Sequence, residues 1–202
     1  MRRLWEWLRG RNGTKNPILL RNEERFTDFD QDKPIESYEF LSFDTELTGL
    51  NPKKDEIVSI GAVRIVGMRI ILGDNFLSYV RPSGNLPKDS TLIHRITPDR
   101  IRDAPDPAEI LPEFVEYCGD SILVGHFVSL DVTVLNRALR KEMGGVITNP
   151  CVDSMRLARA LHELTRRAGQ HRLSVETSFN LTALSRQYGL PIFEQHDALE
   201  DA

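Results

Sequence analysis

Three β-rich runs follow one another closely in the first half of the chain, and they constrain the fold more than any other feature. The runs cover residues 38–46, 56–66 and 69–80, and Gly67 falls in the shortest connection. Antiparallel strands can be joined by short turns, whereas parallel strands need a long crossover. The sequence therefore predicts an antiparallel three-strand meander.

The second half of the chain alternates strand-like and helical patterns. Further strands are expected at residues 121–126 and 150–153, and helices at 107–119, 129–143, 154–164 and 179–189. Gly144 and Gly189 would end two of these helices, and Asp153 would cap the N-terminus of a third. The pattern predicts an α/β fold, in which a mixed five-stranded sheet carries helices on both faces.

Residues 1–36 lack the alternation of a strand and the sustained period of a helix, so we expect an N-terminal extension before a domain of residues 37–202. The extension begins with basic residues. Apolar residues between Leu4 and Leu8 would form one face of a short helix. That face would pack on the domain itself, or on a partner or membrane surface.

Composition limits the class of protein. With 202 residues, of which 40% are hydrophobic, the chain can bury a core of its own. No apolar run approaches the roughly 20 residues that span a bilayer, so no membrane span is expected. Cys118 and Cys151 lack metal-ligand spacing, which favours free thiols in a reducing cytoplasm. The net charge of −4 does not indicate a polyanion ligand, although arginines cluster between Arg156 and Arg172.

Asp44 and Glu46 form the first candidate site, at the end of the first strand. Residues two apart on a strand point to the same face, so the two carboxylates would be neighbours. Their repulsion in a buried site would raise at least one pKa unless a cation were bound, and Mg²⁺ prefers such oxygen ligands. A solvated strand end is the alternative interpretation.

Asp131 lies just inside the helix that follows residues 121–126. Ligands of open α/β sheets collect at the carboxyl ends of strands, where this junction is expected. An acid in the first turn of a helix also complements the helix dipole, which is the alternative role.

His196 and Asp201 stand at the end of the chain, five residues apart. Five residues rotate a helix by about 140°, so the two side chains converge only if His196 precedes the helix or occupies its first turn. A histidine there can accept a proton from water that a metal has acidified. The alternative interpretation is that both are exposed surface residues with no role in a site.

Three motifs in this order resemble the DEDD 3′–5′ exonucleases, in the histidine-containing subgroup that includes the proofreading epsilon subunit of bacterial replicative DNA polymerase. The motifs are DTELTGL (44–50), VGHFVSLDVTVL (124–135) and HDALEDA (196–202), and the stretch LIHRITPDRI (92–101) adds to the likeness. Together they cover the chain from about Tyr38 onward. The resemblance implies a ribonuclease-H-like fold.

The resemblance also implies the ligands and the mechanism. Asp44, Glu46, Asp131 and Asp201 would hold two divalent ions, Mg²⁺ or Mn²⁺, about 3.5–4 Å apart, and His196 would be the general base. One ion would generate hydroxide and the other would stabilise the leaving 3′ oxygen. The family's last helix normally continues past the fourth acid, so we expect the final helix to be cut short or frayed.

The resemblance further implies that Leu47, Thr48 and Leu50 line the pocket for the terminal nucleotide, with Leu50 against the base and the backbone near Thr48 at the sugar. Leu47, Phe127 and Leu130 depart from the family, which usually has Thr, Asn and Phe there. These departures affect substrate fit and leave every expected metal ligand in place.

We therefore expect a metal-dependent 3′–5′ exonuclease that acts on single-stranded or frayed DNA and releases nucleoside 5′-monophosphates. Proofreading would require a separate polymerase partner, and the sequence does not determine the oligomeric state. One alternative keeps the chemistry on RNA or oligoribonucleotides, since no residue is tied to the 2′-hydroxyl. Another is a non-catalytic domain that binds nucleic acid or docks on a partner.

Overall fold

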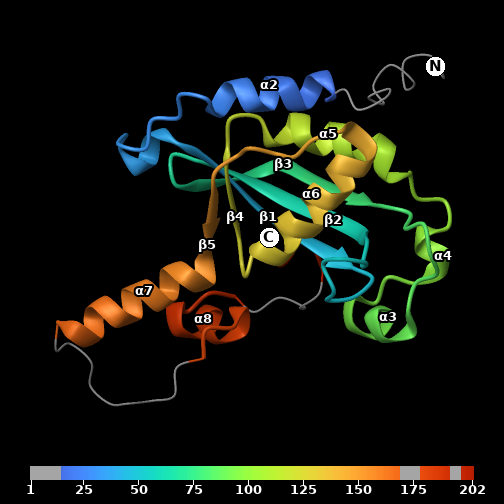
Figure 1. Ribbon diagram of the computed structural model, residues 1–202. Helices are drawn as coiled ribbons and strands as arrows, with labels where there is room; N and C mark the ends of the chain where they lie inside the picture. Colours follow the sequence, from blue (N-terminus) through green and yellow to red (C-terminus); the bar gives the residue numbers. More distant parts are fainter. Residues whose placement is uncertain (1–14, 169–177, 192–196) are drawn as a thin grey trace.

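A computed structural model describes residues 15–168, 178–191 and 197–202, and its centre is one mixed sheet (Figure 1). The strands are β1 (Glu39–Leu47), β2 (Ile57–Val66), β3 (Arg69–Tyr79), β4 (Ile122–Gly125) and β5 (Cys151–Asp153). Their order is β3-β2-β1-β4-β5, in which β1, β2 and β3 pair antiparallel and β4 and β5 add in parallel. The predicted meander and mixed five-stranded sheet are confirmed.

Helices lie on both faces of this sheet. They are α2 (Pro17–Phe26), η2 (Ile35–Ser37), α3 (Lys88–His94), α4 (Pro98–Ile101), α5 (Pro107–Cys118), α6 (Ser129–Met143), α7 (Ser154–Arg167) and α8 (Leu181–Tyr188). Figure 1 shows α5 and α6 over one face, and α7 and α8 as an arm beyond β5. The helices predicted from residue 107 onward correspond to α5, α6, α7 and α8. Within the described residues, no helix has both the length and the apolarity needed to cross a membrane.

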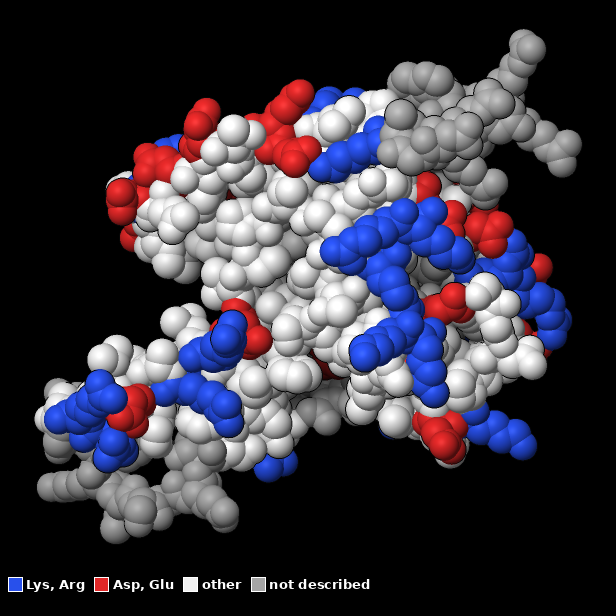
Figure 2. Space-filling model, viewed as in Figure 1, with Lys and Arg blue, Asp and Glu red and all other residues white. Residues whose placement is uncertain are grey.

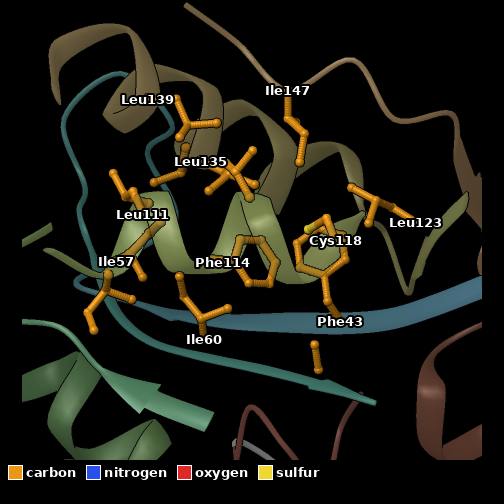
Figure 3. Packing of buried hydrophobic residues seen from close by; sticks show 14 of the residues in the cluster. Phe43, Ile57, Ile60, Leu111, Phe114, Cys118, Leu123, Leu135, Leu139 and Ile147 are labelled. Atoms are coloured by element: carbon orange, nitrogen blue, oxygen red, sulfur yellow. The ribbon is translucent and has the colours of Figure 1, made fainter. Parts of the chain in front are cut away.

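The main hydrophobic core fills the space between the sheet and helices α5 and α6 (Figure 3). Phe43 of β1 and Phe114 of α5 are both buried there, with ring centroids 5.9 Å apart. A smaller cluster on β2, α4 and their neighbours contains Val58, Ile96, Ile101 and Ala104. Burying apolar surface on one side of β1 leaves its other side available for polar residues.

Helix α2 corrects the expectation that residues 1–36 hold no regular element beyond a short helix over Leu4 to Leu8. Asn16 caps it by accepting a 2.8 Å hydrogen bond from the Ile18 N–H. Ile18 and Leu19 are buried in the main core. The Asn22 amide donates to Asn149 Oδ1 over 2.6 Å. Of its apolar side chains only Ile18 and Leu19 are buried, so tertiary contacts with α5 and the 148–149 segment hold this helix rather than a broad apolar face.

Helices α3 and α4 are short and lie between β3 and α5 in the chain. They were also absent from the sequence prediction. Helices this short show little periodicity, and local caps such as Thr97, which accepts from the Arg100 N–H, define them. The apolar run from Leu4 to Leu8 lies outside the described residues. The extension and the domain boundary at residue 37 therefore stay predictions.

We expect Leu19→Ala to lower the free energy of unfolding by about 2–5 kcal/mol, because it opens a cavity where α2 meets the core. Leu20→Ala on the exposed side of the same helix should change it by less than about 1 kcal/mol. Urea denaturation followed by circular dichroism measures both. Equal, small effects would show that α2 is not integral to the fold.

Candidate active site

The end of β1 separates apolar and acidic side chains onto two faces. Phe43 and Leu47 belong to the main core. Asp44 and Glu46 alternate with them and stand opposite Gly61 and Ser59 of β2 in the antiparallel register. As the strand spacing predicts, the two acids share a face.

Asp201 joins these two acids from the last turn of the chain. The Asp197 carboxylate accepts from the N–H groups of Leu199 and Glu200 at 3.0 and 3.3 Å, and the Asp201 N–H donates to the Asp197 carbonyl at 2.9 Å. The turn brings one carboxylate oxygen of Asp201 into a group with Asp44 and Glu46, whose members lie within 4.8 Å of one another. His196, the predicted base, lies outside the described residues.

Gly61 allows the last turn to reach this position. A Cβ placed on Gly61 would lie only 2.2 Å from the carbonyl carbon and oxygen of Ala198, and 2.3 Å from the Leu199 nitrogen. Ala198 itself is only 2% exposed. The backbone of the turn therefore lies directly on β2, opposite Asp44, and only glycine leaves room for it.

Asp131 stands beside the three acids and is held by a bond that the sequence did not suggest. It lies buried in the first turn of α6, and its Oδ1 accepts from the Thr45 hydroxyl at 2.5 Å and from the Thr45 N–H at 3.2 Å. It borders the same cavity as Asp44 but is not in the group of three. The structure thus brings three of the four predicted ligands together and ties the fourth to β1 through Thr45.

Burial and mutual repulsion raise the pKa values of these acids. Burial raises the pKa of Glu46 to about 7, with the charges of Asp201 and Asp197 adding to the effect. Burial, followed by the charges of Asp131 and Glu46, raises the pKa of Asp44 well above its usual value. Burial raises the pKa of Asp131 to about 6 although the Thr45 hydrogen bond opposes it. A cation would relieve this repulsion.

These donors fit a hard divalent cation. Carboxylate oxygens are the ligands that Mg²⁺ and Mn²⁺ prefer. The atoms offered by Asp44, Glu46 and Asp201 are close enough to share one ion. The donor atoms of the site are therefore suited to binding a divalent cation at the end of β1.

A cavity of about 680 Å³ opens above the acids. Leu47, Thr48 and Leu50, which the resemblance assigned to the terminal nucleotide, all line it. Leu47 is buried, whereas Leu50 is 81% exposed. The Thr48 hydroxyl donates to Asp55 and accepts from the Glu56 N–H at 2.9 Å, which fixes this wall next to β2.

The cavity has further lining residues that the sequence analysis left off the site or missed. His94 and His126 both line it, and His126 Nδ1 lies 3.1 Å from the Ser154 hydroxyl. Ile93 and Phe127 line it with exposed apolar side chains. The sequence marked Phe127 only as a departure from the family pattern, whereas its left-handed backbone and the exposure of both side chains are visible only in the structure.

Asp153 caps α7 as predicted, and it also supports the cavity wall. Its Oδ1 accepts from the N–H groups of Met155 and Arg156, which is the N-cap arrangement. The same oxygen accepts from the Phe127 N–H at 3.2 Å. The start of α7 and the loop after β4 are therefore coupled.

Comparison with known proteins relates this chain to a family and to a fold. The RNase_T family, described as an exonuclease family, matches residues 41–202. PolC-type DNA polymerase III of Clostridium perfringens is 32% identical over 95% of this chain and 12% of the polymerase. Its counterpart in Thermotoga maritima is 34% identical over 81% of this chain and 11% of the polymerase. The chain thus spans about a tenth of the length of these curated relatives.

A solved structure shares the fold. The zinc-bound form of the Escherichia coli ExoI–ssDNA complex superposes with a TM-score of 0.70 over 82% of this chain and 38% of that one, at 22% identity. This likeness supports the ribonuclease-H-like architecture expected from the motifs.

The raised pKa of Glu46 predicts how stability depends on pH in cation-free protein. Glu46 loses its proton near pH 4.5 when unfolded and near pH 7 when folded, so the folded state binds more protons between these values. The free energy of unfolding should therefore fall as pH rises through this window, by on the order of 3 kcal/mol from Glu46 alone. Urea denaturation in EDTA at pH 5, 6, 7 and 8 measures it. Glu46→Gln should make the slope shallower, with the remainder coming from Asp44 and Asp131; an unchanged slope would contradict the assignment.

Gly61→Ala should displace the last turn and separate Asp201 from Asp44, because the added methyl group would overlap the Ala198 backbone. We expect cation affinity to fall at least tenfold, measured by Mn²⁺ titration with electron paramagnetic resonance. Gly84→Ala is the matched control, since nothing lies within 4 Å of a Cβ there. Full Mn²⁺ affinity in Gly61→Ala would refute this role of the contact.

Proposed function

The chain belongs to the RNase_T exonuclease family, and from this premise we propose a metal-dependent 3′–5′ exonuclease that hydrolyses DNA from its 3′ end to nucleoside 5′-monophosphates. The family inferred from the three motifs is confirmed, and the chain is accordingly an exonuclease. Its histidine subgroup stays a prediction. The observation that carries the proposal is the convergence of Asp44, Glu46 and Asp201 at the floor of an open cavity.

The acids would hold the cofactor. We assign two divalent ions, Mg²⁺ or Mn²⁺, to Asp44, Glu46, Asp131 and Asp201. Such ions supply positive charge to a phosphodiester and lower the pKa of water. The hydrogen bond from Thr45 would keep Asp131 oriented toward the site. Burial of these carboxylates strengthens their interaction with a cation, because less water competes for it.

His196 would accept the proton of the attacking water, which is the task of a general base. It directly precedes Asp197, whose carboxylate caps the turn that carries Asp201. The proposed base is therefore next in sequence to the turn that holds one proposed ligand. Leu50 would contact the terminal base, and the backbone near Thr48 would bind the sugar.

DNA is the proposed substrate, and a DNA polymerase is the proposed partner. The relatives in Clostridium perfringens and Thermotoga maritima are named DNA polymerase III PolC-type, and the ExoI structure is named as a complex with single-stranded DNA. Cys118 and Cys151 are free thiols, which supports action in the reducing cytoplasm.

The metal and histidine roles predict large losses of activity. With a 3′-labelled single-stranded oligonucleotide and Mg²⁺ or Mn²⁺, we expect release of 5′-monophosphates, and none in EDTA. Asp44→Asn should lower kcat by at least about 10²-fold, by analogy with other losses of transition-state charge stabilisation. His196→Gln should lower it by about 10²–10⁴-fold, as loss of a general base does.

The controls for this experiment are Asp120→Asn, which changes an exposed acid in the turn after α5, and His162→Gln on α7. Both should retain activity. Cleavage that persists in EDTA or in Asp44→Asn would refute the metal mechanism.

Matched DNA and RNA oligonucleotides test the substrate. Faster hydrolysis of RNA would replace the DNA assignment with oligoribonucleotide turnover. Binding without hydrolysis of either would favour the non-catalytic alternative.

A further inference from the structure

We propose that Phe127 stacks on a base of the substrate strand upstream of the 3′-terminal nucleotide. The inference rests on the proposed function, since it requires a strand whose scissile phosphate lies at the acids. It assigns a binding role to a residue at which the chain departs from the family pattern.

Exposed apolar side chains gather around the cavity. Leu50, Ile93 and Phe127 are 81%, 51% and 51% exposed, and they come from three different segments that line the same space. Phe127 is the aromatic member of the three. An aromatic ring left in water on the wall of a cavity that also holds the acids suits a flat apolar ligand such as a nucleic-acid base.

The backbone holds Phe127 in an unusual conformation. Its φ is +58°, a left-handed value that costs energy in a non-glycine residue and is often found at functional sites. Its N–H donates to Asp153 Oδ1 at 3.2 Å, and its carbonyl accepts from the Leu130 N–H at 3.2 Å. The next residue, Val128, is buried in the main core. These contacts fix the loop, so the ring is presented from a defined position.

The position of Phe127 in the sheet indicates which base it meets. The wall proposed for the terminal nucleotide is tied to β2, because Thr48 bonds to Glu56. Phe127 follows β4 and bonds to Asp153 at the end of β5, on the other side of β1. A strand whose phosphate lies at Asp44 would place its terminal nucleotide toward β2 and the preceding nucleotide toward Phe127.

The charge on α7 agrees with this path. Exposed Arg156 and Arg159 lie on the helix that Asp153 caps, Arg166 and Arg167 at its far end pair with Glu163, and Figure 2 shows Lys and Arg side chains on this arm. They would meet the phosphates of the upstream strand. Stacking on every kind of base is sequence-tolerant, as exonucleolytic degradation requires.

The test measures binding of a short single-stranded DNA in EDTA, where no turnover is expected, with 2-aminopurine as the penultimate base to report stacking. Phe127→Gly removes the ring but suits the positive φ, and Phe127→Tyr keeps a stacking ring. Leu72→Ala is the control, because Leu72 is 92% exposed on β3 and does not line the cavity. Thermal unfolding verifies that each variant is folded.

We expect Phe127→Gly to weaken binding roughly 5- to 150-fold, the range for loss of one stacked base, and to restore 2-aminopurine fluorescence. Phe127→Tyr and Leu72→Ala should bind like the wild type. With an abasic penultimate position, wild type and Phe127→Gly should bind equally, because the contact is already absent.

Equal binding of the normal strand by wild type and Phe127→Gly would overturn the inference. The inference would also be overturned if Phe127→Gly still bound more weakly than the wild type to a strand with an abasic penultimate position. The same holds if only an abasic terminal position abolished the difference. Hydrolysis of the labelled strand in Mg²⁺ tests the proposed function separately: wild-type protein that binds and stacks but never hydrolyses would refute that function and not the stacking.

Discussion

The pairing register of β1 and β2 is the constraint on which the site depends. It places Asp44 opposite Gly61 and Glu46 opposite Ser59, while Phe43 faces the core. A slip of one residue would turn every side chain of β1 to the other face, burying the acids under α5 and α6. The hydrophobic contacts that stabilise the fold therefore also determine where the carboxylates point.

Strong periodic patterns made much of the fold predictable. The five strands and the helices α5 to α8 followed from alternation, helical spacing and glycine stops. Helix α2 did not, because it is held by Asn22 hydrogen bonds and two buried side chains rather than by a continuous apolar face. Helices α3 and α4 are too short for a period to show.

The sequence indicated the residues of the candidate site more fully than their geometry. The spacing of Asp44 and Glu46 implied a shared face, and the motif at the chain end pointed to Asp201. The Thr45 hydrogen bond that holds Asp131 joins residues far apart in sequence, so no local sequence pattern predicts it. The left-handed backbone of Phe127 is likewise a product of tertiary contacts.

The contact between Gly61 and the last turn has a consequence for how the molecule acquires its chemistry. Asp44 and Asp201 come from distant parts of the sequence, and closing so long a loop makes such contacts late events in folding. A partly folded chain can form the β1–β2 hairpin and its two acids without the third. The complete group of three acids would then mark the fully folded molecule, and a partly folded chain would carry only two of them.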